Sequence, residues 1–311
     1  KKKMAFTNSE IRATDQTPLT LYHWECSSPK GIIHLIHGMS EHAARYDHFA
    51  CWMNESGYSV IASDLRGHGK TAGSIKNIGH FATRNGWEKV VKDLILISKK
   101  LIEDYPSLPV YIMGHSMGSF LARSIAFTEP SIGDGYILSS TAGHPGLLGV
   151  AGEQLALINT RLMGKRNRSW FLTKLAFGDF NKKYKEKRTE KDWLTKDESI
   201  VDQYINDPYC MQTFTSQFYT DLTRGLLEIN QQSMIDKMDK NKPILFFSGD
   251  MDPVGNYGKG PKEVIEKMKL SGIKDIELTI YENGRHEMLN EVNKEEVYQM
   301  IVSWLNKKIE Q

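Results

Sequence analysis

Short strand-like runs alternate with helical segments along most of the chain, and this alternation restricts the fold more than any other feature of the sequence. Apolar runs of four to six residues are typical of buried strands, while residues 87–103 carry apolar side chains at helical spacing. Such an alternation favours a parallel sheet covered by helices. The expected strands are 31–36, 58–62, 110–113, 135–139, 243–247 and 276–280, with 19–24 as an edge strand, and further helices are expected over 46–54, 120–127 and 292–309.

The alternation stops after residue 142 and resumes at residue 243. The intervening stretch has no strand-like run, is helical in character, and contains a basic segment at 182–191. A chain of 311 residues is long enough for one large α/β domain with an insertion, or for two domains. We therefore predict a core made of residues 1–142 and 233–311, interrupted by a helical cap at 143–232.

The overall composition excludes several classes of protein. A net charge of +2 gives no reason to expect nucleic acid as a partner, and three widely spaced cysteines predict neither a disulfide framework nor a metal-ligand cluster. No cofactor or metal is expected. The chain has no visible signal peptide and no run of about 20 apolar residues, as a membrane span would need. These features predict a cytoplasmic protein, with peripheral association with a membrane as the open alternative.

Residues 114–118 have the pattern G-x-S-x-G and lie between an expected strand and an expected helix. Chance can supply the five residues alone, but strand, tight turn and helix are the context of a nucleophile elbow. The small residues on either side let strand and helix approach closely. The start of a helix also favours negative charge that develops nearby. Ser116 is therefore the candidate nucleophile.

A serine hydroxyl needs a base that takes its proton, and in this kind of site the acid and the histidine follow the serine along the chain. Of ten histidines, only His144 and His286 follow Ser116. His144 comes before any plausible acid loop. His286 lies just past the last expected strand, where open α/β sheets bind their ligands. We therefore predict His286 as general base and later general acid.

Two carboxylates compete for the third position, because Asp250 and Asp252 share the loop after the strand 243–247. Asp252 precedes Pro253, which stiffens the loop, while Asp250 lies nearer the strand end and could cap the turn. The acid would accept the Nδ1–H bond of His286 and fix its tautomer.

A tetrahedral intermediate needs two backbone donors for its oxyanion. One is expected from the residue after the nucleophile, Met117. The other is expected from the turn after strand 31–36, where His37 and Gly38 precede the N–H group of Met39.

Four ordered motifs resemble those of monoacylglycerol lipases and bacterial lysophospholipases of the α/β-hydrolase superfamily. They are H-G-x-x-E-H-x-x-R-Y at 37–46, D-x-x-G-H-G at 64–69, G-H-S-M-G at 114–118 and G-x-x-D at 249–252. The resemblance spans roughly 15–142 and 240–305, and Ser119 departs from it where a third glycine is common. It implies the α/β-hydrolase fold, a mostly parallel central sheet flanked by helices with an inserted helical cap.

The same resemblance implies roles for individual residues. The acid-loop match favours Asp252 over Asp250. Glu41, His42 and Arg45 would brace the oxyanion loop beside His37 and Gly38; the alternative is an exposed charge cluster.

The implied activity is that of a serine hydrolase that cleaves carboxylic esters of single-chain lipids, monoacylglycerol or lysophospholipid, through an acyl-enzyme on Ser116. The substrate is then a small-molecule ester or lipid, and the cap is a candidate for transient contact with a membrane or micelle surface. The alternatives are a carboxylesterase acting on small soluble esters, an S33-type aminopeptidase and a catalytically silent binding protein. A peptidase needs an acidic anchor for a free amine, and the sequence does not identify one.

Overall fold

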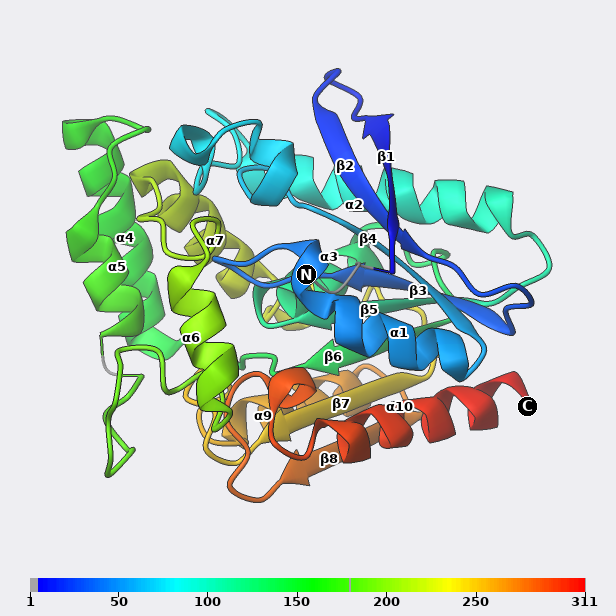
Figure 1. Cartoon of the computed structure of the whole chain (residues 1–311). Helices are drawn as coiled ribbons and strands as arrows, with labels where there is room; N and C mark the ends of the chain where they lie inside the picture. The colour runs from blue at the N-terminus through cyan, green and yellow to red at the C-terminus, as the bar shows by residue number, and fades with distance from the viewer. Residues whose placement is uncertain (1–4, 179, 311) are drawn as a thin grey trace.

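The computed structural model describes residues 5–178 and 180–310, and its centre is one eight-stranded sheet (Figure 1). The strand order is β1-β2-β4-β3-β5-β6-β7-β8. Strands β3 to β8 run parallel to one another. Strand β2 pairs antiparallel with β4, and β1 pairs antiparallel with β2. The strands are β1 Thr7–Arg12, β2 Pro18–Trp24, β3 Gly31–Ile36, β4 Tyr58–Ser63, β5 Val110–His115, β6 Gly135–Ser139, β7 Ile244–Gly249 and β8 Ile276–Tyr281.

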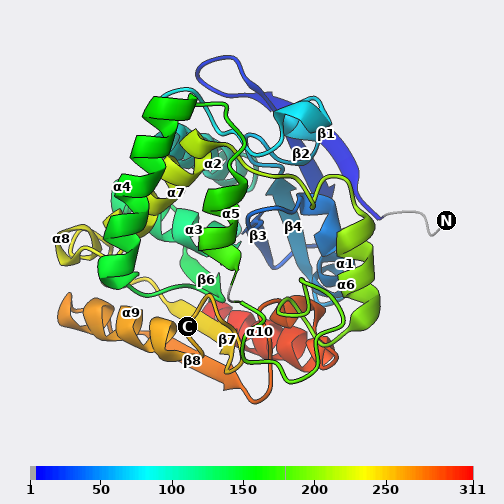
Figure 2. The ribbon, with the colours of Figure 1, turned by 90° about the vertical axis from the view of Figure 1, so that its left-hand side faces the viewer.

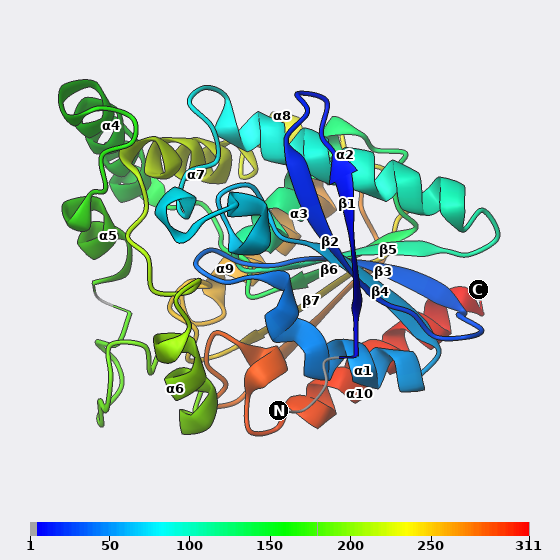
Figure 3. The same cartoon turned by 45° about the horizontal axis from the view of Figure 1, so that its top comes forward.

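Helices cover both faces of this sheet, as Figures 1 and 3 show. Alternate strand residues point to opposite faces, so Ile112 of β5 packs with α2, α3 and α9, while Met113 packs with α1 and α10. The helices are α1 Asp47–Glu55, α2 Gly86–Asp104, α3 Met117–Thr128, α4 Gly146–Met163, α5 Trp170–Phe177, α6 Glu198–Asn206, α7 Ser216–Glu228, α8 Gln232–Ile235, α9 Lys259–Leu270 and α10 Lys294–Ile309. Short 3₁₀ turns occupy Ala43–Tyr46, Gly69–Ala72, Ile75–Asn77 and Met288–Asn290.

The predicted mostly parallel sheet flanked by helices is confirmed, with three corrections at the level of elements. The edge-strand prediction for residues 19–24 is wrong, because β1 lies outside β2. Strand β1 is mostly exposed and polar, so no apolar pattern marks it. Helix α9 was not expected, and α3 begins at Met117 rather than at residue 120.

Helices α4 to α8 lie between β6 and β7 in the chain, and α4 to α7 gather at one end of the sheet (Figures 1 and 2). Within the described part of this stretch, the β pairing is limited to an isolated bridge between Arg168 and Thr215. The division of the chain at residues 142 and 233 stays a prediction.

Arg123 of α3 holds the two ends of this helical insertion together. Its buried guanidinium donates to the carbonyl oxygens of Ala142 and Ile229, both at 2.9 Å, and to Oδ1 of Asn230 at 2.8 Å. Burial lowers the pKa of Arg123 to about 9. The insertion therefore leaves the sheet and returns to it at one point, next to the helix that follows Ser116.

Candidate active site

Ser116 lies at the junction of β5 and α3, on a backbone that L-residues rarely adopt. Its φ is 53° and its ψ is −122°. The chain can turn this sharply because a Cβ atom on Gly114 would lie 2.2 Å from the carbonyl oxygen of Gly118, and one on Gly118 would lie 2.1 Å from that of Ile36. The hydroxyl of Ser119 donates to the carbonyl oxygen of Ser116 at 2.6 Å. The G-x-S-x-G pattern thus corresponds to a strained turn that only glycine permits at both flanking positions.

His286 and Asp252 come from neighbouring loops at the carboxyl ends of β8 and β7. Nδ1 of His286 lies 2.8 Å from Oδ1 of Asp252, and both side chains are buried. The Asp252 carboxylate also accepts from the N–H of Val254 at 3.0 Å and from the hydroxyl of Ser248 at 3.2 Å. Asp250 makes no such contact, since its Oδ1 is buried with no partner among the described residues. Of the two carboxylates, the structure places Asp252 beside the histidine.

The charge balance around His286 favours its protonated form. Burial alone would lower the pKa of the imidazole, but the adjacent Asp252 carboxylate, with Glu287 and Glu41, raises it above its ordinary value of 6.5. The neighbouring His115 behaves differently, because burial and the nearby His286 lower its pKa to about 4. The imidazolium form of His286 is thus stabilised. A general base needs this property, because it must hold a proton during the reaction.

A segment of the helical insertion lies directly against the histidine loop. The N–H of His286 donates to the carbonyl oxygen of Trp193 at 3.3 Å, and that of Glu287 to the carbonyl oxygen of Leu194 at 2.7 Å. The indole of Trp193 lies 5.0 Å from the imidazole of His286 between ring centroids. The insertion therefore contributes to holding the histidine in place.

The turn after β3 brings Gly38 against the nucleophile, since a Cβ atom on Gly38 would lie 3.3 Å from the Cβ of Ser116. The N–H of Leu65 donates to Nε2 of His37, so Nδ1 of His37 carries the proton and donates to the carbonyl oxygen of Gly38 at 2.7 Å. A trans peptide points its N–H opposite to its C=O. His37 therefore fixes the direction of the Met39 N–H group.

Met39 and Met117 are the two residues predicted to offer backbone N–H groups to an oxyanion. Within residues 5–178 and 180–310, neither N–H group donates to a protein acceptor. Met117 is the first residue of α3, where backbone N–H groups lack helical partners. Both donors are thus available to a ligand.

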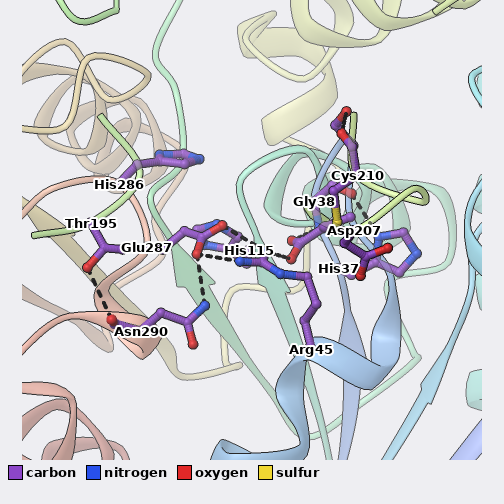
Figure 4. A network of polar contacts seen from close by, with 12 residues as sticks. His37, Gly38, Arg45, His115, Thr195, Asp207, Cys210, His286, Glu287 and Asn290 are labelled. Carbon is purple, nitrogen blue, oxygen red and sulfur yellow. Dashed lines mark hydrogen bonds and ion pairs between the residues drawn. The ribbon is translucent and has the colours of Figure 1, made fainter. Parts of the chain in front are cut away.

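Two buried carboxylates, Glu41 and Glu287, and the partly buried Arg45 between them link the turn after β3 to the histidine loop. Figure 4 shows Arg45 beside Glu287. Glu41 accepts from the N–H of Gly38 at 2.5 Å and from Arg45 at 2.7 Å. Arg45 also donates two hydrogen bonds to Glu287, at 2.8 and 2.9 Å. Burial would raise the pKa of Glu287, but Arg45 lowers it to about 2. Glu41 and Arg45 thus lie where a brace for the oxyanion loop would be.

His42 has a different set of contacts from the one its expected role implies. Its Nε2 lies 2.8 Å from Oδ2 of Asp207, and its ring lies 5.7 Å from that of Tyr209. The hydroxyl of Ser40 donates to the carbonyl oxygen of Cys210 at 2.7 Å. His42 and Ser40 therefore attach the loop to the segment after α6.

The donor atoms of His42, Asp207 and Cys210 lie within 4.8 Å of one another, a grouping that cysteine spacing did not predict. Metals bind the thiolate form of cysteine. Burial raises the pKa of the Cys210 thiol, and the His42 nitrogen is already engaged with Asp207. As they stand, these three side chains form a packing contact rather than a prepared metal centre.

Ser116 and His286 share the wall of a cavity of about 240 Å³. Both the turn after β3 and the helical insertion contribute to this wall. Its apolar lining residues include Met39, Trp170, Phe177, Trp193, Leu194, Met211 and Val254.

The sequence did not identify Glu287, Asn290 or Trp193 as part of the site. Asn290 donates to Glu287 at 2.8 Å, and so completes the shell around Arg45. A charge argument could have found Glu287, because a bracing arginine needs a carboxylate and Glu287 directly follows the candidate histidine. Nothing in the sequence marks Trp193, whose contact depends on how the insertion packs.

The family profile described as "Serine aminopeptidase, S33" matches residues 27–293, most of the chain. The chain belongs to this family. It is a hydrolase of the α/β-hydrolase superfamily, in the branch that contains the monoacylglycerol lipases.

Several known proteins are similar to this S33 hydrolase over most of its length. A monoacylglycerol lipase of Mycolicibacterium smegmatis is 25% identical over 287 residues, 90% of this chain and 89% of the relative. Phospholipase YtpA of Bacillus subtilis is 25% identical over 294 residues, and the match covers 89% of this chain and 96% of the relative. The crystal structure of a thermostable carboxyl esterase from Bacillus coagulans superposes with a TM-score of 0.91 at 28% identity, covering 99% of this chain and 100% of that one. The α/β-hydrolase fold is thereby confirmed.

Proposed function

We propose that this carboxylic ester hydrolase cleaves esters of single-chain lipids, monoacylglycerols or lysophospholipids, through an acyl-enzyme on Ser116. The observation that carries the proposal is the buried His286–Asp252 pair, whose histidine lines the same cavity as Ser116 on its strained turn. The similarity to monoacylglycerol lipases and to a phospholipase supports the same substrate class.

In the proposed reaction, Oγ of Ser116 attacks the ester carbonyl while Nε2 of His286 takes the hydroxyl proton. Asp252, bonded to Nδ1, stabilises the imidazolium. The N–H groups of Met39 and Met117 bind the oxyanion. His286 then gives its proton to the leaving alcohol, and a water molecule, activated by the same imidazole, releases the fatty acid and restores Ser116.

The nucleophile is tested with the Ser116→Ala variant. We expect this variant to lose turnover of a p-nitrophenyl ester and labelling by a fluorophosphonate, while its thermal unfolding stays near that of wild type. Ser119→Ala is the matched control, since its hydroxyl binds the Ser116 carbonyl and should not form the acyl-enzyme. Turnover by Ser116→Ala at the wild-type rate would refute the mechanism.

A second candidate, a carboxylesterase for small soluble esters, is supported by the cavity volume of about 240 Å³, which is small for a ligand pocket. The carboxyl esterase neighbour points the same way. Rates for monoacylglycerols and lysophospholipids from C2 to C18, with amino-acid amides, separate the candidates. A maximum at long chains supports the lipase proposal, one at C2–C4 the esterase, and a preference for amides a peptidase.

Exposed apolar side chains of the helical insertion support a further part of the proposal, transient docking of the cap on a lipid surface. Leu147 and Leu162 of α4 and Trp170, the first residue of α5, are 88%, 78% and 69% exposed, although apolar. Among the described residues, no helix combines the length and apolarity needed to span a bilayer.

We expect the double variant Leu147→Ser/Leu162→Ser to lose co-sedimentation with phosphatidylcholine vesicles. Leu270→Ser, on the 81%-exposed leucine of α9, is the control; equal binding by all three proteins contradicts the docking.

A further inference from the structure

Lys191 brings a positive charge to the catalytic cavity, in the part of the helical insertion between α5 and α6. It lines the same cavity as Ser116 and His286. Its ammonium lies 6.0 Å from the ring centroid of Phe177 and 5.9 Å from that of Tyr204. Among residues 5–178 and 180–310, no acceptor bonds to this ammonium and no carboxylate forms an ion pair with it.

Arg45, which bonds to the cavity-lining Glu41 and Glu287, contrasts with Lys191. Arg45 is neutralised by Glu41 and Glu287, which occupy its donors. An ammonium without a counter-ion in a partly dehydrated site is costly, and burial lowers the pKa of Lys191 although Glu190 opposes this. Two aromatic faces stabilise a cation weakly and leave its three N–H donors unsatisfied. Lys191 is therefore arranged to bind an anion that the protein itself does not supply.

We propose that Lys191 forms an anion subsite in this cavity, and that the preferred substrate is an ester bearing a phosphate or carboxylate near the scissile bond. This inference rests on the ester hydrolysis proposed above and deepens it, because it selects among single-chain esters by charge. The ammonium donates to an anionic oxygen of the substrate while the ester reaches Ser116. Exposed Glu190, which also lines the cavity, opposes the anion and limits its affinity.

The subsite is tested with three substrates that share one acyl chain. Monolauroylglycerol is neutral, 1-lauroyl lysophosphatidate carries a phosphate, and lauroyl lactate carries a carboxylate. For wild type we expect kcat/KM to be higher for at least one anionic ester than for the neutral one. For Lys191→Gln we expect about a tenfold or larger loss on that ester, mostly in KM, because a charge-assisted hydrogen bond is removed.

Three further variants exclude a merely structural role. Lys191→Arg is expected to keep most of the preference, and Lys187→Gln, on an exposed lysine of the same basic segment, to keep all of it. Glu190→Gln is expected to increase the preference, since it removes a negative charge from the cavity wall. The anionic substrate that loses most in Lys191→Gln identifies phosphate or carboxylate as the natural group.

Two results overturn the subsite. One is an equal fractional loss on all three esters in Lys191→Gln, and the other is a wild-type preference for the neutral ester. In either case, continued hydrolysis of monolauroylglycerol leaves the proposed ester hydrolysis intact. If no ester is cleaved, binding of dodecyl phosphate decides: weaker binding by Lys191→Gln than by wild type supports the subsite, and equal or absent binding refutes it.

Discussion

Replacing Glu287 by glutamine changes one charge in the network beside His286 and has two separable consequences. The amide keeps the size of the side chain but cannot form the paired ionic hydrogen bonds that Arg45 makes at 2.8 and 2.9 Å. Arg45 stays paired with Glu41. The variant therefore removes a single buried carboxylate without leaving its partner cation unpaired.

The size of the stability effect follows from the pKa of Glu287, which lies at about 2 instead of its ordinary 4.5. Each tenfold change in proton affinity corresponds to about 1.4 kcal/mol, so the ionised carboxylate contributes about 3 kcal/mol to the free energy of unfolding at neutral pH. Because this pKa is depressed in the fold, the contribution is present above pH 4.5 and is lost as the pH falls from there towards 2. Glu287→Gln should lose up to that amount at pH 7 and show a flatter decline in acid.

The second consequence concerns catalysis. The negative charge of Glu287 raises the pKa of His286, so its removal should lower that pKa. As the proposed general base, His286 would act only when neutral, and the acidic limb of the kcat/KM profile would then report its pKa in the free enzyme. We therefore expect this limb to lie above pH 6.5 in wild type and to move to lower pH in Glu287→Gln.

Urea unfolding at several pH values and a kcat/KM profile on a soluble p-nitrophenyl ester measure the two effects. Glu266→Gln, on an exposed glutamate of α9, is the matched control and should change neither. An unfolding free energy within about 0.5 kcal/mol of wild type at pH 7 would refute the electrostatic argument. So would an acidic limb that moves upward.

Three further substitutions test other parts of the structure. Asp252→Asn is expected to reduce kcat by about 10³-fold or more, and Asp250→Asn to have little effect; equal, mild losses would contradict the assignment. Gly118→Ala would bring a methyl group 2.1 Å from a carbonyl oxygen of β3, so Tm should fall sharply, whereas Gly152→Ala, with open space around it, should be tolerated; similar Tm values would show that the elbow can relax. Arg123→Met leaves buried acceptors unsatisfied, so the free energy of unfolding should fall by about 2–4 kcal/mol and proteolysis at the ends of the insertion should be faster. Unchanged protease lifetimes would show that the Arg123 hydrogen bonds are not needed to hold these ends.

The sequence allowed the central sheet and the candidate triad to be predicted because both depend on local patterns. Each buried strand is a short apolar run, and Ser116, Asp252 and His286 each follow such a run in a loop of a few residues. Parallel strands bring their carboxyl ends to one edge of the sheet, so residues distant in sequence become neighbours by topology. Order along the chain was then enough to discard His144.

The remaining features depend on long-range packing that a sequence pattern does not record. Strand β1 is polar and exposed and forms by pairing with β2. His42 was assigned to the oxyanion loop, but its bond to Asp207 depends on where the segment after α6 comes to rest. Apolar residues of the insertion are equally compatible with a core, a tunnel wall or a lipid-facing surface, and the sequence alone does not distinguish these environments.

Because Arg123 bonds to both ends of the helical insertion, we expect the insertion to be exchangeable between relatives. Its entry at Ala142 and its exit at Ile229 bond to the same guanidinium, so the distance between the two ends is set by α3 and not by the helices between them. Segments inserted between closely spaced ends place little strain on the parent domain. A chimera that receives these helices from a relative, with Arg123 kept, should acquire the donor's substrate preference and retain the host's reaction. Core and insertion could then evolve independently: the core would keep the reaction while the insertion changes the substrate, and Arg123 would be the side chain that joins the two.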